Sequence, residues 1–308
     1  MHIVLMCATK RGRMVLEKIL DHYPDADLTV FSFREDPWEP PFFEEIKTIT
    51  LDHGGIFKES RNVGSQLSAS FWETADIDIA FAVSWRYMIP ARVFNLPMIG
   101  TFVFHDSLLP AYRGFSPTVW SIINGEDHTG VTLFKIADDV DSGDILDQEK
   151  VLIGPDETIA EVMGKVTQTY ISIFEKNIDQ LLNRTFRLKG QDHSRASYTC
   201  KRLPQDNVIN WQASSKDIYN FIRALSQPYP GAYTYLEGEK LRVWSAERIQ
   251  IPAYAGRIPG RVIQLYPAEG SVVLTGDGGL LIKSAQREQG GIECAANIIN
   301  RLGQTLSS

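Results

Sequence analysis

Along residues 1–183, apolar runs of strand length alternate with segments of helical periodicity. The strand candidates are 2–8, 27–33, 76–85, 99–105 and 130–137, and the helix candidates are 9–23, 116–125 and 158–183. The run at 76–85 is almost unbroken, which is typical of a strand covered on both faces. Strands that alternate with helices predict an α/β fold with a mostly parallel sheet and flanking helices.

The pattern changes after residue 188. Residues 189–204 are polar and predict a linker, and one helix candidate follows at 214–227. Short strand candidates, punctuated by Gly, Pro and Asp, then lie at 231–236, 240–246, 260–266, 270–276 and 279–285. This spacing is typical of a small antiparallel barrel or sandwich. We therefore expect a Rossmann-like catalytic domain over 1–188, the linker over 189–204 and an OB-like β-barrel domain over 205–308.

The composition narrows the class of protein. The 308 residues suit two domains, and the net charge of −7 argues against general electrostatic binding of nucleic acid. A small anionic substrate held by a few arginines stays compatible with that charge. Three cysteines without metal-like spacing predict free thiols of a reducing compartment. The N-terminal apolar run is too short to span a membrane, and basic residues follow it, so we expect a cytoplasmic protein with no membrane partner.

A lone histidine ends the apolar run at 99–105. His105 would lie at the carboxyl end of a strand, where open parallel sheets collect ligands. A carboxylate beside it would orient the ring for general acid–base chemistry, and the next strand candidate is followed by Asp138, Asp139, Asp141 and Asp144. A hydrogen-bonded histidine and a solvated acidic turn are the structural alternatives. The loop lacks the spacing of a calcium site and no His cluster supports a transition metal, so no metal is expected.

Three segments carry a resemblance to a known family. HDSLLPAYRG at 105–114, INGEDHTGVTLFKI at 123–136 and DVDSGDIL at 139–146, in this order and spacing, resemble the signature of formyltransferases that use 10-formyltetrahydrofolate. The resemblance extends over the second domain. It implies formyl transfer to an amine, with His105 as the proton carrier and Asp141, thirty-six residues later, as its partner.

The family's catalytic Asn falls on Val103. Valine cannot donate the hydrogen bond that holds the formyl oxygen as it gains negative charge. Another donor could substitute, His105 could carry the oxyanion alone, or the chain could be slow or repurposed. The resemblance also implies a folate site formed by Tyr87, Met88, Ile89, Phe115, Ala137, Asp138, Asp139, Val140 and Asp141. For Met88 and Ile89, plain core packing is the alternative.

The second domain bears on the acceptor amine. PYPGA at 228–232 resembles the sugar-nucleotide branch of the family. Such a substrate presents a diphosphate for Arg, a base for aromatic stacking and a primary amine. The candidates are Arg11, Arg13, Arg86, Arg113 and Arg223 for the anion, and Trp211 and Tyr229 for the ring. As structural alternatives, each of these side chains could be a surface cation or a core residue of the barrel.

The leading hypothesis is therefore an N-formyltransferase that acts on a UDP- or dTDP-linked amino-dideoxy sugar, with folate and the nucleotide sugar as its small-molecule partners. Methionyl-tRNA formylation and a non-catalytic folate- or nucleotide-sugar-binding relative are the main alternatives, and a hydrolase that releases formate is a weaker one. Residues 291–308 could pair subunits as an amphipathic helix or cover the barrel. A homodimer is accordingly one expected state.

Overall fold

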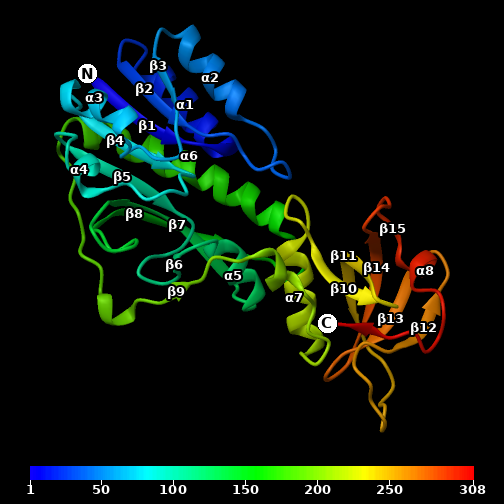
Figure 1. The fold of residues 1–308 in the computed structure, drawn as a ribbon. Coiled ribbons are helices and arrows are strands. Elements are labelled where there is room, and N and C mark those ends of the chain that lie inside the picture. The colour runs from blue at the N-terminus through cyan, green and yellow to red at the C-terminus, as the bar shows by residue number, and fades with distance from the viewer. The chain divides into compact units, whose positions relative to one another are not determined.

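The computed structural model describes residues 1–308, except for the side chain of Leu67, and divides into two compact units (Figure 1). The first unit comprises Met1–Pro117, Thr129–Leu152 and Met163–Cys200. The second comprises Thr118–His128, Ile153–Val162 and Lys201–Ser308. Residues 189–200, for which the sequence predicts a linker, thus belong to the first unit.

A seven-stranded sheet forms the centre of the first unit, in the order β3-β2-β1-β4-β5-β7-β8. Its strands are β1 (His2–Cys7), β2 (Asp27–Ser32), β3 (Ile56–Glu59), β4 (Ile79–Val83), β5 (Gly100–His105), β7 (His128–Lys135) and β8 (Ile145–Leu152). The pairs from β3 to β5 are parallel, and β7 runs antiparallel to β5. The strand order changes direction between β1 and β4, which is where open α/β sheets bind ligands.

Helices cover both faces of this sheet. Its helices are α1 (Thr9–His22), α2 (Phe43–Asp52), α3 (Gln66–Thr74), α4 (Ala91–Phe94) and most of α6 (Ile159–Leu182). On one face, Ala80 and Ala82 of β4 pack with Trp72 of α3 and Val93 of α4. On the other face, Phe81 meets Phe174 of α6 edge to face. Successive strand residues point to opposite faces, so a continuous apolar run satisfies both layers.

An antiparallel sheet forms the core of the second unit, in the order β12-β13-β14-β11-β10-β16. Its strands are β10 (Ala232–Leu236), β11 (Glu239–Ile249), β12 (Val262–Tyr266), β13 (Gly270–Leu274), β14 (Gly279–Arg287), β15 (Glu293–Cys294) and β16 (Leu306–Ser307). The sheet curls into a half-barrel, and a bridge between Arg261 and Thr305 joins its two edges. This unit also contains α5 (Pro117–Ile123, from Thr118 on), α7 (Ser215–Leu225) and α8 (Ala295–Ile298). The fold class expected from the sequence is confirmed.

The C-terminal segment completes the half-barrel. Within 291–308, α8 spans only four residues, and Ile298 and Leu306 are buried. β15 pairs with β14, and β16 pairs with β10. Of the two alternatives left open by the sequence, the segment covers the barrel rather than forming a long amphipathic helix. The homodimer stays a prediction.

Candidate active site

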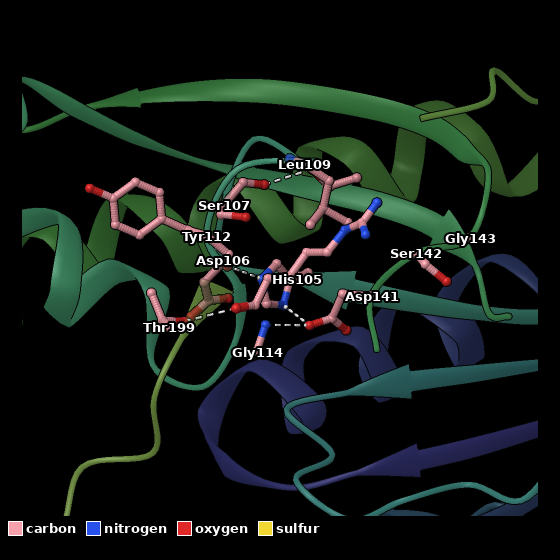
Figure 2. Close-up of polar contacts among 12 residues, drawn as sticks. His105, Asp106, Ser107, Leu109, Tyr112, Gly114, Asp141, Ser142, Gly143 and Thr199 are labelled. Carbon is pink, nitrogen blue, oxygen red and sulfur yellow. Dashed lines mark hydrogen bonds and ion pairs between the residues drawn. The ribbon is translucent and has the colours of Figure 1, made fainter. Parts of the chain in front are cut away.

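His105 is the last residue of β5, and its side chain is held from two sides (Figure 2). Its ring nitrogen Nε2 lies 2.8 Å from the backbone carbonyl oxygen of Tyr112. A carbonyl oxygen only accepts hydrogen bonds, so Nε2 carries a proton and donates it there. The other ring nitrogen, Nδ1, lies 3.5 Å from Oδ2 of Asp141. In the neutral ring Nδ1 is therefore the atom that can accept a proton.

Asp141 comes from the tight loop between β7 and β8. Its backbone has a φ of 47°, a left-handed conformation that Asp tolerates better than most residues. Gly114 donates its backbone N–H to Oδ2 of Asp141 at 2.7 Å. The loop closes against β7 because residue 143 is glycine, since a Cβ there would lie 1.7 Å from the carbonyl oxygen of Lys135. These contacts aim the carboxylate at His105.

The His105–Asp141 arrangement suits general acid–base catalysis. Nδ1 can take a proton from an attacking nucleophile, and the resulting imidazolium then faces a carboxylate 3.5 Å away. The Asp141 side chain is 19% exposed and the His105 side chain 8%, so little solvent screens this charge interaction. The site can therefore pass one proton in and out of a small, partly dry space.

Val103 lies two residues before His105 and on the same face of β5. Its backbone is in register with Ala82 of β4 and Phe134 of β7. Its side chain is only partly buried and packs against two apolar clusters, one containing Ala82 and Ile89 and the other containing Leu109 and Phe134. The position at which the family has a catalytic amide thus presents methyl groups beside the histidine.

The residues predicted to contact folate differ in exposure. Ile89 is buried in the apolar cluster that also holds Ile136, the residue before Ala137. Met88 is 74% exposed, and Phe115 and Val140 are each 48% exposed. Asp138 and Asp139 are exposed, and Tyr87 lies edge to face against Phe33. The 87–89 segment and the start of the 137–141 loop are therefore anchored in the same apolar cluster, through Ile89 and Ile136. The folate contacts of these residues stay a prediction.

The arginines predicted to bind the substrate anion all have partners within the chain. Arg11 pairs with Asp106 at 2.7 Å, Arg13 with Glu17 at 2.6 Å and Arg86 with Glu39 at 2.7 Å. Burial opposes the change, yet the hydrogen bond and charge of Glu39 raise the pKa of Arg86. Arg223 donates to the carbonyls of Gly154 and Glu157, and burial lowers its pKa. Their roles toward a substrate stay predictions.

The two aromatic candidates lie in the second unit. Trp211 is 2% exposed, and its indole N–H donates to Thr234 at 2.9 Å. Trp211 is thus a core residue of the second unit, which was the structural alternative to a role in substrate binding. Tyr229 is half-buried in the 228–232 turn, where its N–H donates to the carbonyl of Ser226. Stacking of either ring on a base stays a prediction.

Gln191 lies at the site, although nothing in the sequence singled it out. Gln191 lies in the polar 189–204 stretch, yet its side chain is buried and donates to the backbone carbonyl oxygens of Asp141 and Gly143, at 2.9 and 2.6 Å. Arg113, a substrate candidate, is 2% exposed and donates to Gln191. A glutamine in a loop-like composition has no periodicity or motif that could mark it as buried.

The described residues contain neither a cluster that could hold a metal nor a helix that could span a membrane. Among them, no group of three or more His, Cys, Asp or Glu could hold a metal ion. In the same part of the chain, no helix is both long and apolar enough to cross a bilayer.

Two family models match the chain along most of its length. Residues 24–178 match the formyl transferase model, and residues 203–303 match that of the formyl transferase C-terminal domain. The chain belongs to the formyl transferase family. The first match includes the paired residues His105 and Asp141. It also includes Val103, which stands where the family resemblance places an Asn.

Solved structures of other formyltransferases share the fold. WlaRD, a sugar 3N-formyltransferase solved in the presence of dTDP and 5-N-formyl-THF, is 21% identical over 94% of this chain and 99% of its own, with a TM-score of 0.66. The N-formyltransferase from Helicobacter canadensis, in complex with folinic acid and dTDP-3-aminofucose, is 20% identical over 93% and 98%, with a TM-score of 0.67. Methionyl-tRNA formyltransferase from Clostridium thermocellum is 21% identical over 81% and 94%, with a TM-score of 0.57.

Proposed function

We propose that this formyltransferase-family chain moves the formyl group of 10-formyltetrahydrofolate to the primary amine of a UDP- or dTDP-linked amino-dideoxy sugar. The observation that carries the proposal is the pairing of His105 Nδ1 with Asp141 at the end of β5. An amine that attacks a formyl carbon must lose a proton, and the folate nitrogen that leaves must gain one. A single positioned base that becomes an acid serves both steps.

In this reaction, His105, Asp141 and Val103 would each have a distinct role. Bound 10-formyltetrahydrofolate would supply the formyl group. His105 Nδ1 would take the proton from the amine nitrogen and return it to the departing nitrogen, while Nε2 stays bonded to Tyr112. Asp141 would stabilise the ring while it is charged. Val103 offers no hydrogen bond to the formyl oxygen, so we expect a slower reaction than a site with an amide there would give.

The exposed apolar side chains support a folate donor. Met88, Phe115 and Val140 present apolar surface to solvent on segments that the family resemblance assigns to folate. Exposed apolar side chains that gather around a few polar groups are typical of small-molecule sites. Two solved structures with this fold contain reduced folates, as their names state.

The net charge of the chain and the sequence of its second unit support a nucleotide sugar as the acceptor of the formyl group. The net charge of −7 disfavours a long phosphate backbone as the partner, although residues 201–308 carry twelve Lys and Arg against nine Asp and Glu. The PYPGA turn resembles the sugar-nucleotide branch, and WlaRD and the Helicobacter canadensis enzyme are similar to this chain over more than nine-tenths of its length. These features support a nucleotide sugar over a tRNA.

Product detection by mass spectrometry tests the proposal. The protein would be incubated with 10-formyltetrahydrofolate and a panel of uridine-, thymidine-, guanosine- and cytidine-linked 4-amino and 3-amino sugars, with the His105→Asn variant as control. One formyl group gained by one panel member, and only with the unmodified protein, supports the proposal. Formylation of methionyl-tRNA instead would establish the tRNA alternative.

A non-catalytic binding protein is the second candidate, and Val103 is the observation that favours it. In that case folate and a nucleotide sugar would bind, and no formylated product would form at any enzyme concentration. Isothermal titration with 5-formyltetrahydrofolate and each panel sugar separates this outcome from a protein that binds neither ligand.

A further inference from the structure

Residues 189–199, here called the strap, contact both the 110–115 segment that follows His105 and the loop that carries Asp141. The strap begins at an antiparallel bridge in which Lys189 and Ile145 exchange two backbone hydrogen bonds of 2.8 Å. It ends as β9 (Tyr198–Thr199), which pairs in parallel with β6 (Arg113–Gly114). Both ends are therefore fixed to segments that flank the catalytic pair.

Gln191 holds the Asp141 side of the pair. Its Nε2 donates to the carbonyl oxygens of Asp141 and Gly143, which lie on the same loop. Its Oε1 accepts from Arg113 at 3.2 Å and 2.5 Å. The oxygen and the nitrogen of the Gln191 side-chain amide are thus both hydrogen-bonded. The orientation of the amide is fixed because Arg113 can only donate and the two carbonyls can only accept.

Arg113 explains why Gln191 is rigid. Its guanidinium is buried, and among the residues the structure describes its partners are neutral: Gln191, His193 and Tyr198. A buried charge needs every hydrogen bond it can make, so Arg113 holds the amide oxygen firmly. The cation therefore acts on Asp141 through Gln191.

Ser197 holds the His105 side. Its Oγ accepts the backbone N–H of Tyr112 at 2.9 Å, and its carbonyl accepts the N–H of Arg113 at 2.8 Å. The carbonyl of Tyr112 is the group that accepts from His105 Nε2. Figure 2 shows Tyr112, Gly114 and Thr199 around the two catalytic side chains. The strap lies this close because residue 114 is glycine: a Cβ there would be 2.6 Å from the carbonyl oxygen of Thr199.

We propose that Gln191 and Ser197 are positioning residues for the His105–Asp141 pair. Gln191 fixes the backbone that aims the Asp141 carboxylate, and Ser197 fixes the carbonyl that keeps the proton of the neutral His105 ring on Nε2, so that Nδ1 is the proton acceptor. This role rests on the proposed function, because it supports the proton transfer assigned to His105. Two residues of the strap, and not the segment as a whole, would thus position the pair.

Gln191→Glu separates positioning from folding. The carboxylate keeps acceptors for Arg113 and adds an ion pair, so we expect the melting temperature to be maintained. It loses both N–H donors and places negative charge against two carbonyl oxygens, which pushes the Asp141 loop away. We expect kcat to fall by on the order of tenfold to a hundredfold, with the pH profile of kcat shifted while the melting temperature is maintained. Arg195→Gln is the control, since it changes the net charge equally at an exposed position of the strap.

Ser197→Ala tests the contact that holds the His105 side of the pair. It leaves the Tyr112 N–H without this acceptor at an exposed position, so folding should persist and kcat should fall by about three- to tenfold. Ser194→Ala, which removes a hydroxyl bonded to Asp192 and not to the pair, is its control. In the unmodified protein, nitrogen-15 NMR of the His105 ring should show the proton on Nε2. In Ser197→Ala it should show a mixture of tautomers.

The NMR measurement separates the two proposals, because it needs no turnover. Altered tautomer or titration of His105 in the strap variants, with no formyl transfer by the unmodified protein, would support the strap's role and reject the proposed function. Normal kcat and an unchanged His105 titration in both Gln191→Glu and Ser197→Ala would overturn the role of the strap, whatever the substrate.

Discussion

His105 and Asp106 are neighbours in sequence, yet their side chains point to opposite faces of the sheet and belong to different networks. His105 faces Asp141, with 3.5 Å between Nδ1 and Oδ2. Asp106 accepts from Arg11 of α1 at 2.7 and 2.9 Å and from the hydroxyl of Tyr170 of α6. Burial, and then the Asp106 charge, raise the pKa of Tyr170 well above its usual value. One face of the strand end thus carries the proposed proton carrier, while the other face anchors the strand.

Removing either member of the catalytic pair should abolish turnover. In His105→Asn and Asp141→Asn, we expect kcat to fall on the order of 100-fold to 10,000-fold, because no group remains to pass the proton or to stabilise the charged ring. Asp141→Asn keeps an oxygen for the Gly114 N–H, so its melting temperature should change little. Asp144→Asn, an exposed neighbour on the same loop, is the control. Near-normal rates in both variants would refute the mechanism.

Val103→Asn should raise activity and lower stability together. An amide there could hold the formyl oxygen, and one such donor is worth about a hundredfold or more in rate. The side chain now packs against Phe134 and Ala82, so burying an amide there should lower the free energy of unfolding by about 1–3 kcal/mol. Val103→Thr, which cannot reach as far, is the control. An unchanged rate would mean that another group already holds the oxyanion.

Gly143→Ala should displace the Asp141 loop. The added methyl group would lie 1.7 Å from the carbonyl oxygen of Lys135, so the backbone must move. We expect a loss of kcat comparable to that of Asp141→Asn and a fall in melting temperature, both measured on the purified protein. Gly164→Ala is the control, because no atom lies within 4 Å of a Cβ at that position of α6.

The Arg11–Asp106 pair separates an anchoring role from substrate binding. The Arg11 side chain is 7% exposed, and breaking a buried pair costs about 3–5 kcal/mol. We expect Arg11→Met and Asp106→Asn each to lower the free energy of unfolding by roughly 3 kcal/mol, with the double variant less destabilised than the sum. Urea unfolding measures this. If Arg11→Met instead leaves stability unchanged and raises KM for the nucleotide sugar, Arg11 is a substrate ligand as the sequence suggests.

Asp277 should contribute a pH-dependent part of the stability of the second unit. The backbone N–H of Ser215, at 2.7 Å, and the hydroxyl of Thr275 lower the pKa of Asp277 below its usual 3.8. Because the folded-state pKa is the lower one, this stabilisation is present above about pH 4 and disappears as the pH falls through the folded-state pKa. Asp277→Asn should cost less than about 1 kcal/mol at pH 7, and this cost should shrink as the pH falls through the folded-state pKa. Glu288→Gln, at an exposed turn, should show no such difference.

The secondary structure was predictable where the pattern was regular. The strands β1, β2, β4, β5 and β7 and the helices α1 and α6 lie within a few residues of the predicted ranges, because continuous burial on two faces demands long apolar runs. α2, β3, α3 and β8 were missed. The pattern IFKE of β3 and ILDQEKVL of β8 mixes charged and apolar residues, since both strands lie at the edges of the sheet and one side meets water.

The sequence could single out the candidate pair of His105 and Asp141, but not the residues that hold the pair in place. His105 and Asp141 follow strands and carry a motif, so their type and spacing were enough to single them out. Gln191, Ser197 and the carbonyl of Tyr112 act through backbone contacts that any sequence could make. Arg113 was expected to face a substrate, and only its burial reveals that it bonds Gln191.

The sequence by itself determined the α/β and antiparallel units and the formyl transferase signature, and it singled out His105 as the candidate proton carrier and Val103 at the position where the family resemblance places an amide. These depend on periodicity and on residue type, which the chain displays directly. Tertiary structure alone decided that Nε2 of His105 is bonded to the Tyr112 carbonyl while Nδ1 faces Asp141, that Arg11 bonds Asp106, and that residues 189–199 hold the segments around His105 and Asp141. The last two facts depend on donors and acceptors that lie 50 to 95 residues apart along the chain, which no local pattern encodes.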